Sequence, residues 1–229
     1  MFRKLAHQAL LTLLFSTIAT VGLLGPGVAG TAHAEGVDLE RGEQLFLLCT
    51  QCHGANGGGM VDALAPGIAG LPLWYVDGQL TKFKTGVRGM HPDDTGGLRM
   101  YPMSLWLRDE ADQKAVAAYV ASLPVVAPEH DMDMDEIGNA TAGAGAYAVC
   151  SACHGADAAG NEGMGAPPLK DFADWYLYSA ITKYKAGVRG SGPGDALGAA
   201  MIGMAGTLAT DEAVRDVIAH IQSLGPNGQ

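Results

Sequence analysis

Basic residues are scarce in this sequence, and cysteines are few. Its 229 residues include 14 Lys and Arg against 24 Asp and Glu, which gives a formal net charge of −10 at pH 7. Nucleic-acid binding needs a basic face, so this composition argues against a nucleic-acid partner. The four cysteines form two Cys-x-x-Cys pairs, each followed at once by histidine. That arrangement points away from simple disulfides.

Long apolar runs are missing after residue 34. No later segment approaches the about 18 uninterrupted apolar residues expected of a membrane-spanning helix. At the start, Arg3 and Lys4 precede an apolar stretch, and Ala32-His33-Ala34 offers an A-x-A cleavage site. We therefore predict that residues 1–34 are a signal peptide cleaved near Ala34 and that the protein is exported to the periplasm. An uncleaved N-terminal anchor is the alternative. Cleavage would leave 12 basic and 24 acidic residues, a formal charge of −12.

An internal repeat is the most informative feature of the sequence. Positions 101 residues apart match over about 80 residues without a gap. The matches include the two Cys-x-x-Cys-His motifs, Trp-Tyr pairs, Lys-x-Gly-x-Arg-Gly segments and Met-x-x-Met runs. We read the chain as a tandem duplication, with a first domain over residues 35–124, a linker over 125–136 and a second domain over 137–229.

The predicted linker is rich in proline and acidic residues. Pro124 and Pro128 are followed by an alternation of Asp and Met with one histidine, His130. A stretch of this kind between two repeats indicates an exposed, solvated segment. A metal-binding tract is the less favoured interpretation.

Helical patterns predominate in both repeats, and no alternating strand pattern is evident. Each copy shows three expected helices: about 38–49, a segment from Trp74 that stops at Gly86, and about 109–123, with counterparts at about 140–150, from Trp175 to Gly187, and after Thr210. Asp38 and Thr210 are suitable N-caps. The predicted fold class is therefore all-α. Three helices and long Gly-rich loops give each repeat a thin core, which a large apolar cofactor would complete.

The two motifs fit covalent haem attachment. Two thiols three positions apart on a helical turn project the same way and can each add to a haem vinyl group, while the next histidine reaches the iron. The residues are Cys49, Cys52 and His53, and Cys150, Cys153 and His154. A structural zinc site, a thioredoxin-like dithiol and two ordinary disulfides are the alternatives. We predict two covalently bound haem c groups.

The opposite face of each iron needs a sixth ligand or stays open. Met100 and Met201 each follow the motif histidine by 47 residues, and Met103 and Met204 lie three positions further on. A thioether ligand favours Fe(II) and raises the reduction potential. Spacing alone does not choose between the two methionines of each pair.

These residues resemble the dihaem class I cytochromes c of the cytochrome c4 type, over essentially the whole chain after the leader. The resemblance rests on both Cys-x-x-Cys-His motifs, on Pro66-Gly67-Ile68 and Pro167-Pro168-Leu169, on the Lys-x-Gly-x-Arg segments and on the Met-x-x-Met runs. It implies two tandem cytochrome c domains, each wrapped around a covalent haem. It also implies that Met100 and Met201 are the ligands and that Pro66 and Pro167 pack near the histidines, although the doubled proline leaves Pro168 open.

The resemblance further implies a periplasmic carrier of single electrons. Expected partners are a quinol–cytochrome c reductase, a terminal oxidase or a dehydrogenase, with any membrane association through them. A dihaem enzyme (peroxidase-like or thiosulfate-oxidising) and a subunit of a larger complex are the alternatives; a cysteine-ligated haem would need a thiol beyond the four in the motifs. Four cations are expected either near haem propionates or on solvated helix ends. They are Lys84, Arg88, Lys185 and Arg189.

Overall fold

Two groups of four α-helices make up the part of the chain that the computed structural model describes, residues 36–128, 131–132 and 138–225. All of these residues belong to one structural unit, Ala34–Gln229. The predicted signal peptide and part of the predicted linker, including His130, lie outside the described residues.

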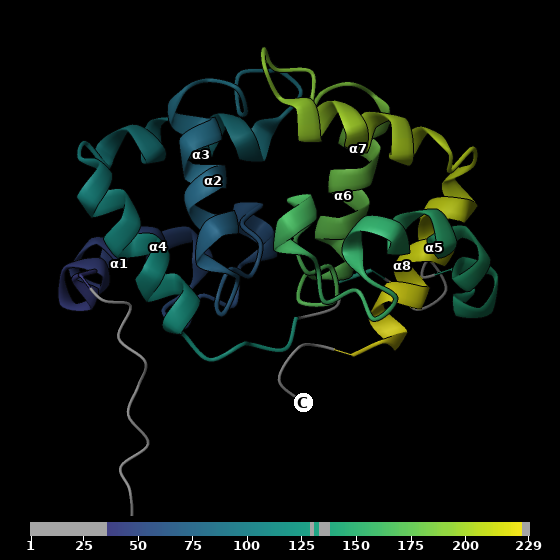
Figure 1. The fold of residues 1–229 in the computed structure, drawn as a ribbon, viewed down its shortest axis with the longest axis horizontal. Helices are drawn as coiled ribbons and strands as arrows, with labels where there is room; N and C mark the ends of the chain where they lie inside the picture. Colours follow the sequence, from purple (N-terminus) through teal and green to yellow (C-terminus); the bar gives the residue numbers. More distant parts are fainter. Residues whose placement is uncertain (1–35, 129–130, 133–137, 226–229) are drawn as a thin grey trace, which may run out of the picture. The chain divides into compact units, whose positions relative to one another are not determined.

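The helices follow the duplication seen in the sequence (Figure 1). The first repeat contains α1 (Leu39–His53), α2 (Leu73–Lys84), α3 (Thr95–Trp106) and α4 (Glu110–Ser122). The second contains α5 (Ala140–His154), α6 (Asp174–Lys185), α7 (Ala196–Gly206) and α8 (Asp211–Ser223). Short 3₁₀ turns, η1 (Val61–Ala63) and η2 (Glu162–Met164), precede α2 and α6. The predicted all-α class is confirmed, and no helix in the described part is long and apolar enough to cross a bilayer.

Side-chain caps start several of these helices. The Asp38 carboxylate accepts a hydrogen bond from Arg41 N at 2.8 Å, and the Thr210 hydroxyl accepts one from Ala213 N at 3.1 Å. Each cap satisfies a backbone N–H that lacks a partner within its own helix. Both N-caps predicted from the sequence are confirmed.

The expected outline of three helices per repeat is wrong, because α3 and α7 were not predicted. Gly96, Gly97 and Pro102 weaken helix propensity in α3, and α7 contains three glycines. Asp94 and Asp195 are the signals that were missed, since each caps one of these helices. The first helices also run further than expected, to His53 and His154.

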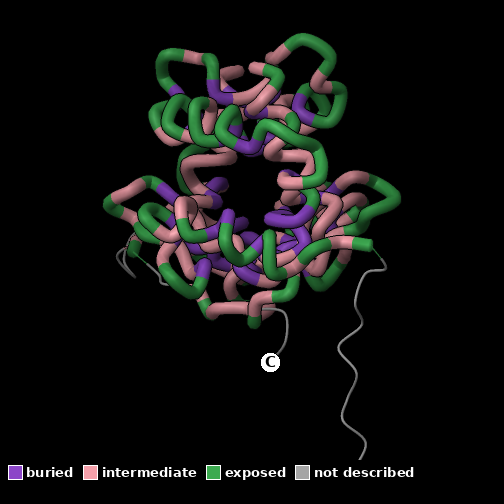
Figure 2. Tube along the Cα trace, turned by 90° about the vertical axis from the view of Figure 1, so that its left-hand side faces the viewer, coloured by how far each residue is buried: buried purple, intermediate pink, exposed green. Residues whose placement is uncertain are grey.

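Close crossings of α1 with α4 and of α5 with α8 build the core of each repeat. A Cβ on Gly42 would lie 2.2 Å from Ala115 O, and a Cβ on Gly143 would lie 1.8 Å from Asp216 O. Only glycine lets the helix backbones approach this closely. Figure 2 shows buried segments gathered toward the interior of the helical groups. In the first repeat, Leu45, Phe46, Leu107, Val116 and Val120 form one apolar cluster.

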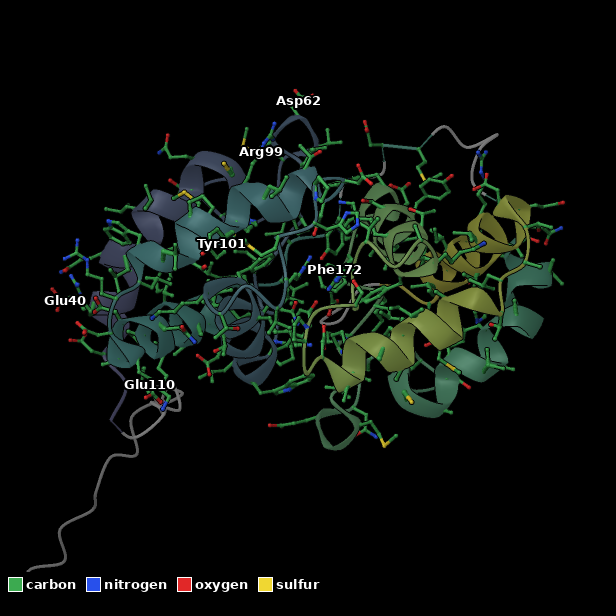
Figure 3. All side chains as sticks on the ribbon, turned by 90° about the horizontal axis from the view of Figure 1, so that it is seen from above. Glu40, Asp62, Arg99, Tyr101, Glu110 and Phe172 are labelled. Carbon is green, nitrogen blue, oxygen red and sulfur yellow. The ribbon has the colours of Figure 1, made fainter. Side chains whose placement is uncertain are left out.

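A second apolar cluster joins the two repeats. Leu71 and Tyr75 from the first repeat pack with buried residues of the second, among them Phe172 and Leu177. The rings of Tyr75 and Phe172 meet edge to face, with centroids 6.2 Å apart. Figure 3 shows Phe172 where the two groups of helices meet. The repeats therefore share part of their hydrophobic core.

Candidate haem sites

The last turn of a helix holds each Cys-x-x-Cys-His motif. Cys49, Cys52 and His53 lie at the end of α1, and Cys150, Cys153 and His154 lie at the end of α5. Gly54 and Gly155 end these helices at φ 77° and 82°, a region that L side chains rarely adopt. The two thiols and the imidazole therefore project from one rigid turn, as the sequence argument required.

Both motif histidines are buried and held by a carbonyl. His53 Nδ1 lies 2.8 Å from Pro66 O, and His154 Nδ1 lies 2.8 Å from Pro167 O. A carbonyl can only accept, so each Nδ1 carries the proton and each Nε2 is left with its lone pair for a metal. Burial lowers the pKa of both histidines, against an opposing effect of these hydrogen bonds. The sequence left open whether Pro167 or Pro168 packs near His154, and the hydrogen bond identifies Pro167.

A largely apolar cavity of about 360 Å³ lies against His53. Met100 is on its wall, together with Leu64, Leu80 and Phe83. Met103 does not line this cavity, and 37% of its surface is exposed. In the second repeat Met201 is half-buried, whereas Met204 is 40% exposed. The first repeat thus places Met100, and not Met103, on the cavity wall, and the second repeat leaves Met201 more buried than Met204.

The cavity also contains an unused hydrogen-bond donor. Arg88 lines it, and Arg88 Nε is buried without a hydrogen-bond partner. A carboxylate inside the cavity would satisfy this N–H. An apolar wall, a neutral imidazole, a thioether and an unpaired guanidinium N–H together fit a porphyrin with iron at its centre and carboxylates at its rim.

The other three cations divide between two kinds of position. Lys84 Nζ donates to Leu107 O, and Lys185 Nζ donates to Leu208 O. These lysines close the turns that follow α3 and α7. Arg189 is buried at the junction of the repeats, where its guanidinium donates to Tyr176 OH. Among the four, Arg88 is therefore the one placed on the cavity wall.

Cys49 and Cys150 lack the lowered thiol pKa of a redox-active dithiol. All four are free of disulfides. Burial raises the pKa of Cys49 to about 11, and burial also raises the pKa of Cys150. Reactive dithiols have lowered pKa values instead. The raised pKa values thus argue against the thioredoxin-like alternative.

Comparison with known proteins identifies the family. A sequence profile described as cytochrome c matches residues 39–124 and again residues 140–225. This chain belongs to the cytochrome c family. Its two tandem cytochrome c domains imply two covalently bound haem c groups, for which Cys49/Cys52 and Cys150/Cys153 fit as attachment pairs. The predicted dihaem, cytochrome c4-like character is confirmed, and so is a role in electron transfer.

Individual relatives agree with this assignment. The chain is 32% identical over 165 residues to a thiosulfate dehydrogenase electron acceptor of Stutzerimonas stutzeri, covering 66% of this chain and 69% of that protein. It is 34% identical over 136 residues to the cbb3-type cytochrome c oxidase subunit CcoP of Rubrivivax gelatinosus, covering 57% of this chain but only 38% of the subunit. One relative is named an electron acceptor and the other an oxidase subunit, in keeping with electron transfer and with redox proteins as partners.

Solved structures show the same fold. The thiosulfate dehydrogenase TsdBA of Marichromatium purpuratum has a TM-score of 0.64 and 27% identity, over 80% of this chain and 40% of that one. Reduced cytochrome c4 of Pseudomonas stutzeri also has a TM-score of 0.64, with 24% identity over 81% of this chain and 98% of that one. The second likeness shows that both repeats have the arrangement of a cytochrome c4.

Proposed function

We propose that this protein is an exported carrier of single electrons with two six-coordinate haem centres, His53/Met100 and His154/Met201. The observation that carries the proposal is the placement of His53 and Met100 on the wall of one apolar cavity. The same sequence spacing, a buried histidine and a half-buried methionine recur in the second repeat. Both domains would then bind haem in the same manner.

The roles of the side chains follow from their chemistry. Haem c supplies an iron whose Fe(III)/Fe(II) couple takes up and releases one electron. The cysteines anchor the group, and each histidine offers Nε2 while the proline carbonyl fixes its tautomer. The thioethers of Met100 and Met201 would favour the reduced state, and the apolar wall of the cavity beside His53 would keep water away from the first haem. Arg88 would donate its free N–H to a haem carboxylate.

Two protein ligands on each iron would leave no position for a substrate, as expected of a carrier rather than an enzyme. The thiosulfate dehydrogenase among the similar structures is the specific reason to test an enzymatic alternative. All four cysteines of this sequence belong to the attachment motifs. No cysteine of the chain therefore remains to ligate an iron.

The defining experiment measures haem content and ligation in the purified, natively exported protein. We expect a pyridine haemochrome and a protein mass that correspond to two haems, with an N-terminus at Glu35. The variant Cys150→Ala/Cys153→Ala should retain one covalent haem, and Cys49→Ala/Cys52→Ala the other. A colourless exported protein, or one whose haem is extracted by acid acetone, would overturn the proposal.

The partner that we propose is a dehydrogenase that delivers electrons singly. The relative named a thiosulfate dehydrogenase electron acceptor motivates this choice. Mixed with a catalytic amount of a thiosulfate dehydrogenase and thiosulfate, the oxidised protein should become fully reduced; with thiosulfate alone it should stay oxidised. Reduction by thiosulfate alone would favour the enzymatic alternative.

A further inference from the structure

Two ion pairs cross between the repeats in a reciprocal manner. Lys82 Nζ lies 2.7 Å from Asp195 Oδ1, and Lys183 Nζ lies 2.8 Å from Asp94 Oδ1. Adding 101 to Lys82 gives Lys183, and adding 101 to Asp94 gives Asp195. Each repeat therefore offers the other the same lysine and the same aspartate, the arrangement of a two-fold symmetric interface.

The carboxylates of these pairs are buried, and the lysines are partly exposed. The side chains of Asp94 and Asp195 are 4% and 6% exposed, and those of the lysines 26% and 27%. Exposed ion pairs contribute little, whereas removal of one member of a buried pair is costly. Lys82 and Lys183 therefore matter more than lysines in surface pairs such as Lys114–Glu110.

Each aspartate is also the N-cap of a methionine-bearing helix. Asp94 Oδ1 accepts from Gly97 N at 3.2 Å at the start of α3, and Asp195 Oδ1 accepts from Gly198 N at 2.9 Å at the start of α7. The oxygen that caps the helix is the one that receives the ammonium from the other repeat. Met100 and Met201 lie six positions after their caps, in the second helical turn.

The lysine acts on the helix only through its aspartate. A cation near a helix N-terminus is unfavourable on its own, because it opposes the positive end of the helix dipole. The carboxylate between them reverses this, since it is attracted to both the ammonium and the first-turn N–H groups. A carboxylate held by a lysine therefore stays directed at its helix.

Other contacts hold the repeats close enough for the lysines to reach. Arg88 and Arg189 both donate to Tyr176 OH at 3.3 Å, so one phenol joins guanidinium groups from both repeats. A Cβ on Gly192 would lie 2.0 Å from Val87 O, which shows backbone contact across the junction. The crossed lysines are thus part of a packed interface.

From this geometry we infer that the methionine ligand of each domain is positioned in trans: Lys183 steadies the helix that carries Met100, and Lys82 steadies the helix that carries Met201. The inference rests on the proposed function, in which these methionines bind iron. Lys82 and Lys183 are positioning residues. Lys183 and Asp94 also lie on the wall of the cavity against His53, whereas Lys82 does not.

The experiment uses the full-length protein with both haems attached. In the reduced state each iron-bound methionine gives its own shielded methyl signal in the proton NMR spectrum, and Met100→Ala and Met201→Ala assign the two signals. Imidazole binding to the oxidised protein then measures how easily each methionine is displaced. Lys183→Met should broaden the Met100 signal and raise imidazole affinity about tenfold at the first haem alone, as expected for loss of a hydrogen bond to a buried charge. Lys82→Met should do the same at the second haem alone.

Controls separate this inference from general destabilisation and from the proposed function. Lys114→Met removes an exposed lysine and should leave both haems unchanged. Asp94→Asn keeps a capping oxygen but removes the charge; if Lys183→Met folds poorly, this variant should still loosen Met100. If Lys183→Met affects both haems equally, or neither, the inference is wrong. If the wild-type protein shows no methionine signal at all, the proposed ligation fails instead.

Discussion

The backbone of Gly143 in α5 lies against the carbonyl of Asp216 in α8 so closely that a Cβ at residue 143 would be 1.8 Å from that oxygen. Gly145, two positions along the same helix, has no such neighbour within 4 Å of an added Cβ. Gly143→Ala should therefore destabilise the protein by about 2–3 kcal/mol through overpacking. Gly145→Ala should stabilise it by up to about 1 kcal/mol through helix propensity. Denaturant unfolding of both variants tests this, and equal effects would contradict it.

Met100→Ala should lower the reduction potential of one haem, because a thioether ligand favours Fe(II). Axial ligation tunes haem potentials over roughly 0.8 V, so the shift should be evident in a redox titration. Met103→Ala is the matched control, since Met103 is partly exposed and absent from the cavity wall. Met201→Ala and Met204→Ala form the corresponding pair in the second domain. If Met103→Ala lowered the potential and Met100→Ala did not, Met103 rather than Met100 would be the iron ligand.

Acid should weaken the Asp94–Lys183 pair. Burial raises the pKa of Asp94. The hydrogen bond and charge of Lys183, together with Arg88 and the Gly97 N–H, lower the pKa by a larger amount, so the net shift is downward from 3.8. The ionised carboxylate therefore stabilises the fold above that ordinary value, and the stabilisation is lost as pH falls through the lower folded-state pKa. The difference in thermal stability between wild type and Asp94→Asn should be constant near neutral pH and should shrink in acid. A difference that does not shrink as the pH falls below 3.8 would count against this assignment.

Electron exchange with a protein partner should slow as salt is added. The chain carries an excess of acidic residues, and Glu40, Asp62 and Glu110 are exposed on the first repeat (Figure 3). Such a surface steers a partner with a basic patch, and salt screens this attraction. Stopped-flow rates at increasing ionic strength measure the effect. Reduction by a small uncharged reagent is the control and should not change; equal rates at all ionic strengths with the partner would contradict electrostatic docking.

The parts of the fold that sequence predicts well are governed by local residues. The motif helices, the Asp38 and Thr210 caps and the all-α class each depend on neighbours within one or two turns. The haem attachment residues could be predicted equally well from the sequence, because Cys-x-x-Cys-His is a short motif that the chain contains twice. Duplication strengthened each of these predictions.

The features that escaped prediction depend on distant partners or on weak local signals. The glycines and proline of α3 and α7 hide two helices whose starts are fixed by Asp94 and Asp195. The preference for Met100 over Met103 required the cavity, which gathers residues from both repeats. The crossed lysine–aspartate pairs depend on how the repeats pack, although the recurrence of both residues at a spacing of 101 was visible in the sequence.

Chain order gives the crossed pairs a consequence for biogenesis. Lys183 follows Asp94 by 89 residues, and a polypeptide emerges with its N-terminus first. Cys49 and Cys52 both lie on α1, which is translated early. The ion pair that holds Asp94, the N-cap of α3, requires Lys183 of α6, which is translated much later. Maturation of the first centre should therefore finish only when the second half of the molecule has arrived beside it.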